Sequence, residues 1–396
     1  MVALATALTG CAERTASVPR DLRSASCRPE SVAVDLRSVI TAMHARNRVP
    51  GISAAALIPS RWTTPVAVAV GVTALSGGRP LTVDDRFLAG SVGKTFFAAL
   101  ALRRSAEGHF PLDSPLVAFI GAARLPSFRW ITPRMLLSHT SGLGEYDVTF
   151  MTSLVREPLR VRTTDDWLDV LRRNPPKRRD VGRFRYSDLN FVVLAMALDA
   201  RSSESAYASI ERAYLRPLDL SATSPSVSTT IPRLVTGYDG AAGMFGRDAM
   251  LENGQLLYNP QFEWGGGGFV SRPVDLARWI SAIRHGHAFP AALWPEVIAK
   301  PEGIPRAERH WIGMGLHVDS VGRGVAFGHS GYMPGYVTWM RWYEAFGISL
   351  AIQANASDSV RLVDDGYGWM DSVAFRVGAR CGVGSGPQRA DRPGDR

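Results

Sequence analysis

Apolar residues recur with helical spacing near the start of the chain. Leu36, Val39 and Met43 lie on one face of a predicted helix that Ser31 caps and that ends before Pro50. A second helical pattern, over residues 360–377, closes the patterned part of the sequence. Helices are therefore predicted at both ends of the fold.

Strand-like apolar runs lie on both sides of a helical middle. Two follow the first helix and four precede the last, over residues 52–58, 66–72, 311–318, 325–328, 336–342 and 348–353. Between them, residues 91–260 show apolar helical stripes at 135–137 and 191–198, separated by long loops that contain proline. One more helix is predicted over residues 274–283.

The order of these elements suits an α/β fold whose sheet is completed by both ends of the chain. We predict a sheet subdomain from residues 31–90 and 265–381, with a mainly helical subdomain from residues 91–264. Residues 1–30 lack periodicity and are predicted to be a signal-like segment and tether, and residues 382–396 a disordered tail.

The composition is that of a globular protein. Of 396 residues, 46% are hydrophobic and 20% are charged, which is close to ordinary usage. The formal net charge of +9 comes mostly from scattered arginines rather than from one basic face, so no nucleic-acid partner is expected. The sequence has no run of 18 apolar residues, so no membrane-spanning helix is predicted. The oligomeric state is left open.

The N-terminal residues resemble an export signal. Leu8, Thr9, Gly10 and Cys11 are similar to the lipobox of bacterial lipoproteins, which predicts a lipid anchor at Cys11. The expected location is the bacterial cell envelope, on the periplasmic side, and the alternative location is outside the cell, by secretion. The alternative to a lipobox is an ordinary apolar N-terminus. The cysteines and histidines lack zinc-site spacing, so neither a metal nor another cofactor is predicted.

A Ser-x-x-Lys pair stands before an apolar helical run. Ser91 and Lys94 are three residues apart, so on a helix they share one face. A serine hydroxyl is a weak nucleophile until a base accepts its proton, and a lysine with a lowered pKa can be that base. A phosphate-binding P-loop is the rival interpretation because Lys94-Thr95 imitates its end, but that motif needs glycine where Leu88 stands.

Two further segments carry polar groups suited to catalysis. Tyr186, with Ser187 and Asp188 after it, precedes an apolar helix, and its phenol could carry a proton. The alternative there is a helix cap at Ser187 or Asp188 with Tyr186 as its hydrophobic staple. Residues 328–332, Gly-His-Ser-Gly-Tyr, lie in a strand-like run whose glycines allow a substrate backbone to approach. An α/β-hydrolase nucleophile elbow would need glycine in place of Tyr332.

In this order, the three segments resemble the active-site motifs of the penicillin-binding protein and serine β-lactamase superfamily. The branch is that of class C β-lactamases and D-alanyl-D-alanine carboxypeptidases, and the resemblance runs from about Ser31 to Arg380. Residues 131–143 and the glycine-rich stretch 264–283 are similar to other shared parts of that branch. The resemblance implies an antiparallel sheet flanked by helices, with a helical insertion.

The resemblance also implies a role for each residue. Ser91 would be the acylated nucleophile, Lys94 its base and Tyr186 the proton shuttle to the leaving group. The backbone N–H groups of Ser91 and Tyr332 would form the oxyanion hole. The strand that docks the substrate and its carboxylate would contain His329, Ser330 and Gly331. His139 is expected to fix its turn rather than to react.

Two residues depart from the family pattern. Asp188 stands where many members have asparagine, and a carboxylate there cannot donate an amide hydrogen bond and would raise the pKa of Lys94. His329 replaces lysine, a form that resembles carboxypeptidases more than class C β-lactamases. We therefore expect an acyl-enzyme serine hydrolase, most like a D-alanyl-D-alanine carboxypeptidase. An esterase or a class C-like β-lactamase is the nearest alternative, and a non-catalytic penicillin-fold binding protein is the alternative of another class.

The resemblance finally implies a disulfide between Cys27 and Cys381. In the resembled fold the first and last helices pack side by side against the sheet, so antiparallel packing brings these two ends together. An oxidising compartment would allow the bond to form, and Cys11 would be left for lipidation. Two unrelated thiols are the alternative.

Overall fold

The computed structural model describes residues 27–121, 124–301, 309–322, 324–358 and 360–382. The predicted lipid anchor at Cys11 lies outside these residues, as do nearly all of the predicted tether and tail. Cys27 and Arg28 already belong to the fold, because Arg28 accepts the first backbone hydrogen bond of the helix that follows, from Val32. The folded part therefore begins earlier than the predicted boundary near residue 31.

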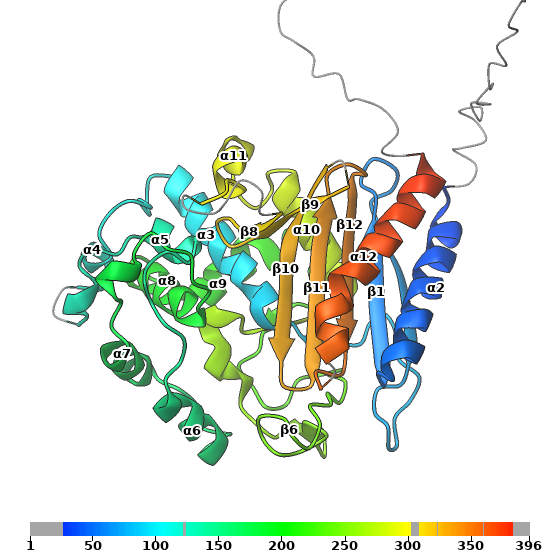
Figure 1. Ribbon diagram of the computed structural model, residues 1–396, viewed down its shortest axis with the longest axis horizontal. Coiled ribbons are helices and arrows are strands. Elements are labelled where there is room, and N and C mark those ends of the chain that lie inside the picture. Colours follow the sequence, from blue (N-terminus) through cyan, green and yellow to red (C-terminus); the bar gives the residue numbers. More distant parts are fainter. Residues whose placement is uncertain (1–26, 122–123, 302–308, 323, 359, 383–396) are drawn as a thin grey trace, which may run out of the picture.

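A seven-stranded antiparallel sheet forms the centre of the fold (Figure 1). Its strand order is β2-β1-β12-β11-β10-β9-β8, so the two chain ends meet where β1 pairs with β12. The strands are β1 (Gly51–Leu57), β2 (Val66–Gly71), β8 (His310–Ile312), β9 (His317–Val321), β10 (Gly324–Met333), β11 (Tyr336–Tyr343) and β12 (Ile348–Ala354). Every residue of β1, β11 and β12 is buried. The predicted α/β fold, with a sheet from both chain ends, is confirmed.

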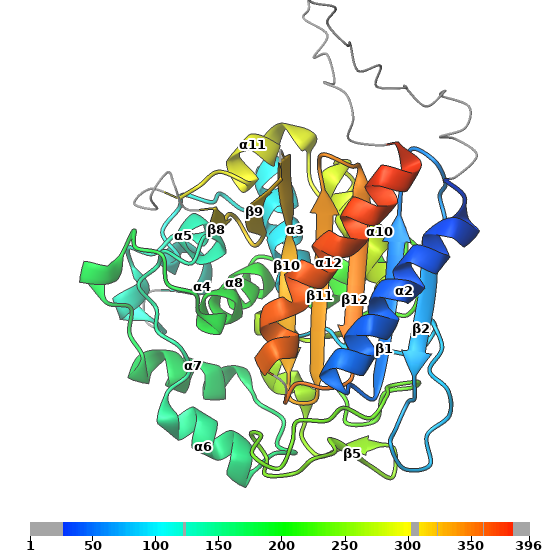
Figure 2. The ribbon, with the colours of Figure 1, turned by 45° about the vertical axis from the view of Figure 1, so that its right-hand side comes forward.

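Helices cover both faces of this sheet (Figure 2). α2 (Pro29–Asn47) and α12 (Val360–Cys381) pack against each other on one face, and α10 (Pro273–Arg284) packs on the other. The predicted apolar face of the first helix is buried. Ser31 is not its cap, however, because the helix begins at Pro29, whose fixed φ suits the first helical turn.

The remaining helices lie mainly beside the sheet, on the side of β10 (Figure 1). They are α3 (Lys94–Ala106), α4 (Val117–Ile120), α5 (Pro133–Leu137), α6 (Val148–Arg156), α7 (Thr164–Arg173), α8 (Asp188–Ala200), α9 (Ala206–Ile210) and α11 (Trp294–Val297). Five short strands form two further sheets, one in the order β3-β7-β4 and one from β5 and β6. They are β3 (Phe87–Leu88), β4 (Ser224–Pro225), β5 (Leu251–Glu252), β6 (Gln255–Leu256) and β7 (Phe269–Ser271). Residues 189–198 of α8 are buried and, apart from Asn190, apolar, as expected for a helix inside a core. Across the described ranges, no helix is both long and apolar enough to cross a membrane.

Two of the strand predictions differ from the structure. The run predicted over 311–318 is two strands, β8 and β9, because Gly315 turns the chain between them with a φ of 76°. The run predicted over 325–328 and the strand-like residues 328–332 form one longer strand, β10. This places His329 to Tyr332 inside a strand, which matters for the site below.

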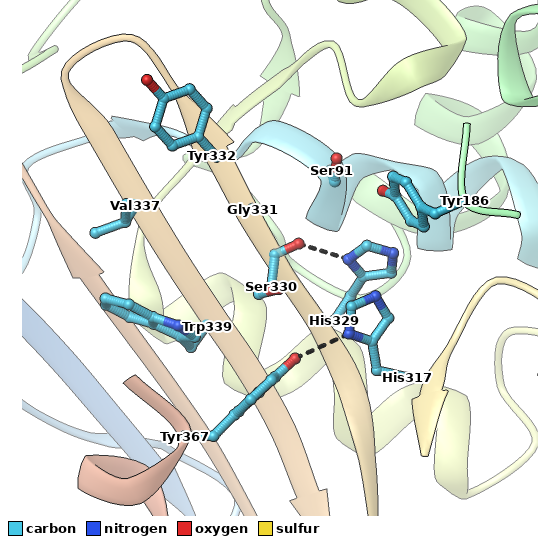
Figure 3. A pocket seen from close by; sticks show the side chains of 10 residues that line it. All are labelled: Ser91, Tyr186, His317, His329, Ser330, Gly331, Tyr332, Val337, Trp339 and Tyr367. Atoms are coloured by element: carbon cyan, nitrogen blue, oxygen red, sulfur yellow. Dashed lines mark hydrogen bonds between the residues drawn. The ribbon is translucent and has the colours of Figure 1, made fainter. Parts of the chain in front are cut away.

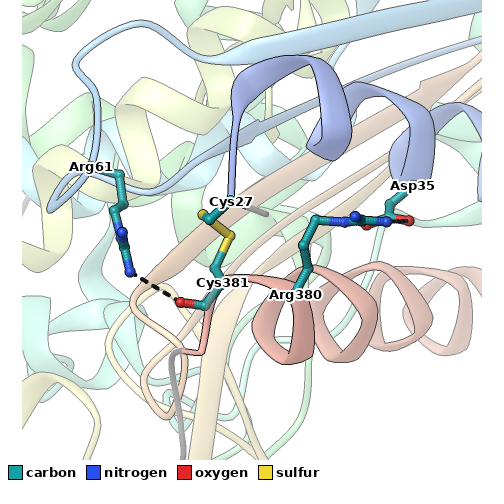
Figure 4. Close-up of a disulfide and its surroundings, with 5 residues drawn as sticks. All are labelled: Cys27, Asp35, Arg61, Arg380 and Cys381. Carbon is teal, nitrogen blue, oxygen red and sulfur yellow. Dashed lines mark hydrogen bonds and ion pairs between the residues drawn. A yellow bond between two sulfur atoms is a disulfide. The ribbon is translucent and has the colours of Figure 1, made fainter. Parts of the chain in front are cut away.

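A disulfide joins the start of α2 to the end of α12 (Figure 4). The Cα atoms of Cys27 and Cys381 are 4.6 Å apart, so the predicted bond is confirmed. Two neighbouring interactions hold the same junction: Arg380 pairs with Asp35 at 2.5 Å, and Arg61 donates a hydrogen bond to the carbonyl oxygen of Cys381 at 3.1 Å.

The double substitution Cys27→Ser/Cys381→Ser is expected to lower the free energy of unfolding by about 2–4 kcal/mol, because the bond closes nearly the whole chain and restricts the unfolded state. Urea denaturation with and without reductant measures the effect. Reductant should destabilise the parent protein and leave the double variant unchanged. Free thiols at both positions in non-reducing peptide mapping of exported protein would show that the bond does not form.

Candidate active site

Ser91 and Lys94 lie where a short 3-10 turn, Gly90–Gly93, runs into α3. The α-helix begins at Lys94, so Ser91 lies in the tighter turn before it. The predicted pairing is present, because Nζ of Lys94 donates a hydrogen bond to Oγ of Ser91 at 2.8 Å. The spacing of the two residues along the chain thus places amine and hydroxyl in contact.

Lys94 is fully buried, and its ammonium group has three acceptors. Besides Ser91 Oγ, these are Oδ1 of Asp188, at 2.5 Å, and the carbonyl oxygen of Gly266. An ammonium group has three N–H bonds, so all of them are used. Trp264, two residues before Gly266, has a φ of 34°, a strained value for a side-chain-bearing residue, in the turn that presents this carbonyl. In this arrangement Lys94 is a proton donor and not yet a base.

Acidic groups surround the Lys94 ammonium. Asp188 pairs with it directly, and the backbone N–H of Asp188 donates to Oε1 of Glu145 at 2.6 Å. Glu263 is 7% exposed, and burial together with the charge of Asp188 raises its pKa to about 8. Burial lowers the pKa of Lys94, but Asp188, Tyr186 and Glu263 raise it by more, so the net pKa lies above that of an ordinary lysine. The expected effect of Asp188 on Lys94 is confirmed in direction.

Tyr186 lies beside Ser91 at the pocket (Figure 3). Its ring centroid is 5.2 Å from Nζ of Lys94, and the ring stacks on His139 at 4.4 Å. Burial raises the pKa of Tyr186 to about 12, while Lys94 works in the opposite direction. The phenol therefore keeps its proton at neutral pH and can give it to a leaving group.

Contacts of the loop before α8 fix the position of Tyr186. Ser187 is the N-cap of α8 and accepts a hydrogen bond from the N–H of Leu189 at 3.2 Å, so the cap interpretation is confirmed for this residue. The backbone N–H of Ser187 donates to Nδ1 of His139 at 3.2 Å. His139 has a φ of 55° and is buried, and burial and Lys94 lower its pKa well below the usual value. The His139 ring packs against Tyr186, and its hydrogen bond with Ser187 joins its own turn to the start of α8.

The edge of β10 faces the turn that carries Ser91. β9 pairs with β10 only as far as Gly328, so residues 329–333 have no strand on that side among the described residues. A Cβ on Gly90 would lie 2.6 Å from the carbonyl oxygen of Tyr332, and one on Gly331 would clash with the carbonyl oxygen of Ala89. Only glycine permits this approach, which brings the backbone of Tyr332 next to Ser91. The predicted oxyanion hole requires this arrangement.

A cavity of ≈ 300 Å³ opens over these groups. Its lining residues are Ser91, Tyr186, His317, His329, Ser330, Gly331, Tyr332, Val337, Trp339 and Tyr367. Six of the predicted site residues thus meet at one pocket. Of the other two, Lys94 contacts Ser91, and Asp188 contacts Lys94. His317, Trp339 and Tyr367 were not predicted, because only the register of β9, β10 and β11 and the packing of α12 bring them here.

Comparisons with known proteins show the family of the chain and its likeness in fold to solved structures. The sequence matches the family model described as Beta-lactamase over residues 36–374. A D-stereospecific amidohydrolase from Streptomyces is 24% identical, with a TM-score of 0.70, and the match covers 86% of this chain and 98% of that one. D-Amino acid amidase from Ochrobactrum anthropi SV3 is 21% identical, with a TM-score of 0.74 over 87% of this chain and 99% of that one. An octameric penicillin-binding protein homologue from Pyrococcus abyssi is 22% identical, with a TM-score of 0.70 over 87% and 77%. At these identities the structures are similar in fold.

Proposed function

The chain belongs to the Beta-lactamase family, and from this premise we propose that it is a serine hydrolase that acts through an acyl-enzyme on Ser91. The observation that carries the proposal is the 2.8 Å hydrogen bond from buried Lys94 to Ser91, at a pocket that Tyr186 also lines. A helix-end serine with only a structural role needs neither a buried amine nor a cavity in front of it.

The geometry supports acylation of Ser91 with a proton acceptor and a proton donor in place. Once Lys94 is neutral, its Nζ accepts the proton of Ser91 while Oγ bonds to the substrate carbonyl carbon. The carbonyl electrons move to oxygen, where the backbone N–H groups of Ser91 and Tyr332 stabilise the charge. When they return, the bond to the leaving group breaks, and that group takes a proton from Tyr186, which recovers one from Lys94. Water then attacks the ester in the same way and restores Ser91.

For the acyl donor, we propose small amides or peptides whose acyl group has the D configuration. Support comes from the likeness in fold to proteins named as a D-stereospecific amidohydrolase and a D-amino acid amidase. A D-alanyl-D-alanine carboxypeptidase is the second candidate, favoured by the open edge of β10, along which an extended peptide can lie. Rapid β-lactam turnover is disfavoured, because Asp188 raises the pKa of Lys94 and because His329 stands where class C β-lactamases have lysine.

Labelling with a fluorescent penicillin, with mass mapping of the adduct, tests the acyl-enzyme. We expect one adduct, on Ser91, and faster hydrolysis of D-amino acid amides, D-alanyl peptides or short-chain esters than of cephalosporins. A panel of D and L amides then identifies the preferred acyl group. Absence of both an adduct and any turnover would favour the penicillin-fold binding protein, and cephalosporin turnover at kcat/KM near 10⁶ M⁻¹ s⁻¹, within the usual range for enzymes, would overturn the substrate order.

We also propose that the protein works outside the inner membrane, in the bacterial cell envelope. The disulfide between Cys27 and Cys381 supports an oxidising compartment. The lipobox-like residues ending at Cys11 support a lipid anchor there. Membrane fractionation after Cys11→Ser tests the anchor, which predicts release of the protein from the membrane fraction.

A further inference from the structure

The wall of the pocket beyond Ser91 contains two imidazole rings in contact. His317 on β9 and His329 on β10 have ring centroids 4.1 Å apart, and both line the cavity (Figure 3). Among the described residues that line it, none is a lysine or an arginine. The charge state of these two histidines therefore decides whether this wall can hold an anion.

His329 is held in one neutral tautomer. Its Nδ1 lies 2.5 Å from the carbonyl oxygen of Ser330. A carbonyl oxygen only accepts, so Nδ1 carries the proton and Nε2 of a neutral ring is an acceptor. That Nε2 is buried and has no hydrogen-bond partner in the described structure. Burial, with Lys94 adding to it, lowers the pKa of His329 to about 3.

His317 is also kept uncharged by its surroundings. Its Nδ1 is 3.3 Å from the hydroxyl of Tyr367, and its Nε2 is buried without a partner in the described structure. Burial and the neighbouring His329 and His310 lower its pKa well below the usual value, and they outweigh Asp319. Both rings thus present dipoles and not charges to the pocket.

The cations near this wall are already engaged. Lys94 uses its three N–H bonds beneath Ser91. The guanidinium of Arg341 is 3.7 Å from the ring centroid of Tyr367. It forms ion pairs with Asp319 and Asp371 and is 2% exposed. A carboxylate entering here would lose water without gaining a cation, which is costly.

We propose that His317 and His329 form a leaving-group subsite that accepts uncharged, N–H-bearing groups, such as the nitrogen of a primary amide or an amidated peptide, and disfavours leaving groups that carry a carboxylate. The inference rests on the proposed acyl-enzyme function and separates its two candidates, because a carboxypeptidase releases an amino acid whose carboxylate would lie against this wall. An uncharged amide, in contrast, needs no cation at this wall and loses less than a carboxylate on leaving water.

A matched substrate pair tests the subsite in the unaltered protein. The D-acyl group preferred in the panel above is joined either to D-alaninamide or to D-alanine, so the two substrates differ only in a carboxamide or carboxylate on the leaving group. We expect kcat/KM to favour the amidated substrate by about tenfold or more. Equal rates, or a preference for the free acid, would overturn the subsite, whereas loss of acylation with every substrate would overturn the proposed function instead.

His317→Arg adds a cation to the same wall. It should lower the preference for the amidated substrate by about tenfold, mainly through KM for the free acid, because a guanidinium binds a carboxylate well. The matched control is His109→Arg, an exposed position outside the pocket, which should leave the ratio unchanged. An unchanged ratio in a folded His317→Arg protein contradicts the proposal. If that variant does not fold, the ratio measured on the unaltered protein still decides.

Discussion

Ser91→Ala is expected to abolish acylation by penicillins and to reduce hydrolysis of the preferred amide by about 10⁴-fold or more, because it removes the pocket serine hydroxyl that Lys94 contacts. Lys94 would lose one of its three acceptors and keep Asp188 and Gly266. Steady-state kinetics on the amide and on an activated ester, together with adduct mapping, measure the loss.

The fold of this variant should be intact, because Ser91 is half-buried in a short turn and its side chain contacts polar groups of the pocket, Lys94 and Tyr186, rather than the core. An unchanged thermal unfolding midpoint would show that the loss is chemical. Ester hydrolysis near the wild-type rate in a folded Ser91→Ala protein would mean that another residue is the nucleophile.

Asp188→Asn is expected to raise kcat/KM at neutral pH by about tenfold or more and to move the acid limb of the pH profile to lower pH. The rate depends on neutral Lys94, and each pH unit below its pKa reduces that fraction tenfold. Of the groups that raise the pKa of Lys94, Asp188 contributes most. Asparagine removes this charge and keeps an oxygen for the hydrogen bond, so the pKa of Lys94 should fall and more of it should be neutral.

Glu263 and Tyr186 still raise the pKa of Lys94 in this variant, while burial still lowers it. The acid limb of the pH profile should therefore move to lower pH but remain measurable. Asp248→Asn, an exposed carboxylate outside the pocket, is the matched control and should leave the profile unchanged. A loss of activity at every pH in a folded Asp188→Asn protein would contradict this account, because it would mean that catalysis needs the carboxylate itself, as a proton acceptor for Lys94.

Much of the helix and strand pattern could be predicted because it depends on near neighbours along the chain. The buried face of α2 and the apolar run of α8 follow from side-chain spacing alone. The boundaries that were wrong depended on competing local signals: proline at the start of α2 outweighed a serine cap, and a glycine turn divided β8 from β9. The polar end of β10 lacks apolar alternation and fell outside the apolar run at 325–328, but its glycines had already placed residues 328–332 in a strand-like run, which the structure confirms.

The amino-acid sequence by itself determined the contact between Ser91 and Lys94 and the cap at Ser187, because residues within one turn of a helix meet wherever that helix lies. Tertiary structure alone decided the charge of Lys94, the neutral pair His317 and His329, and their place at the pocket wall. These properties depend on burial and on strand register between segments that are far apart along the chain. No local spacing encodes either quantity.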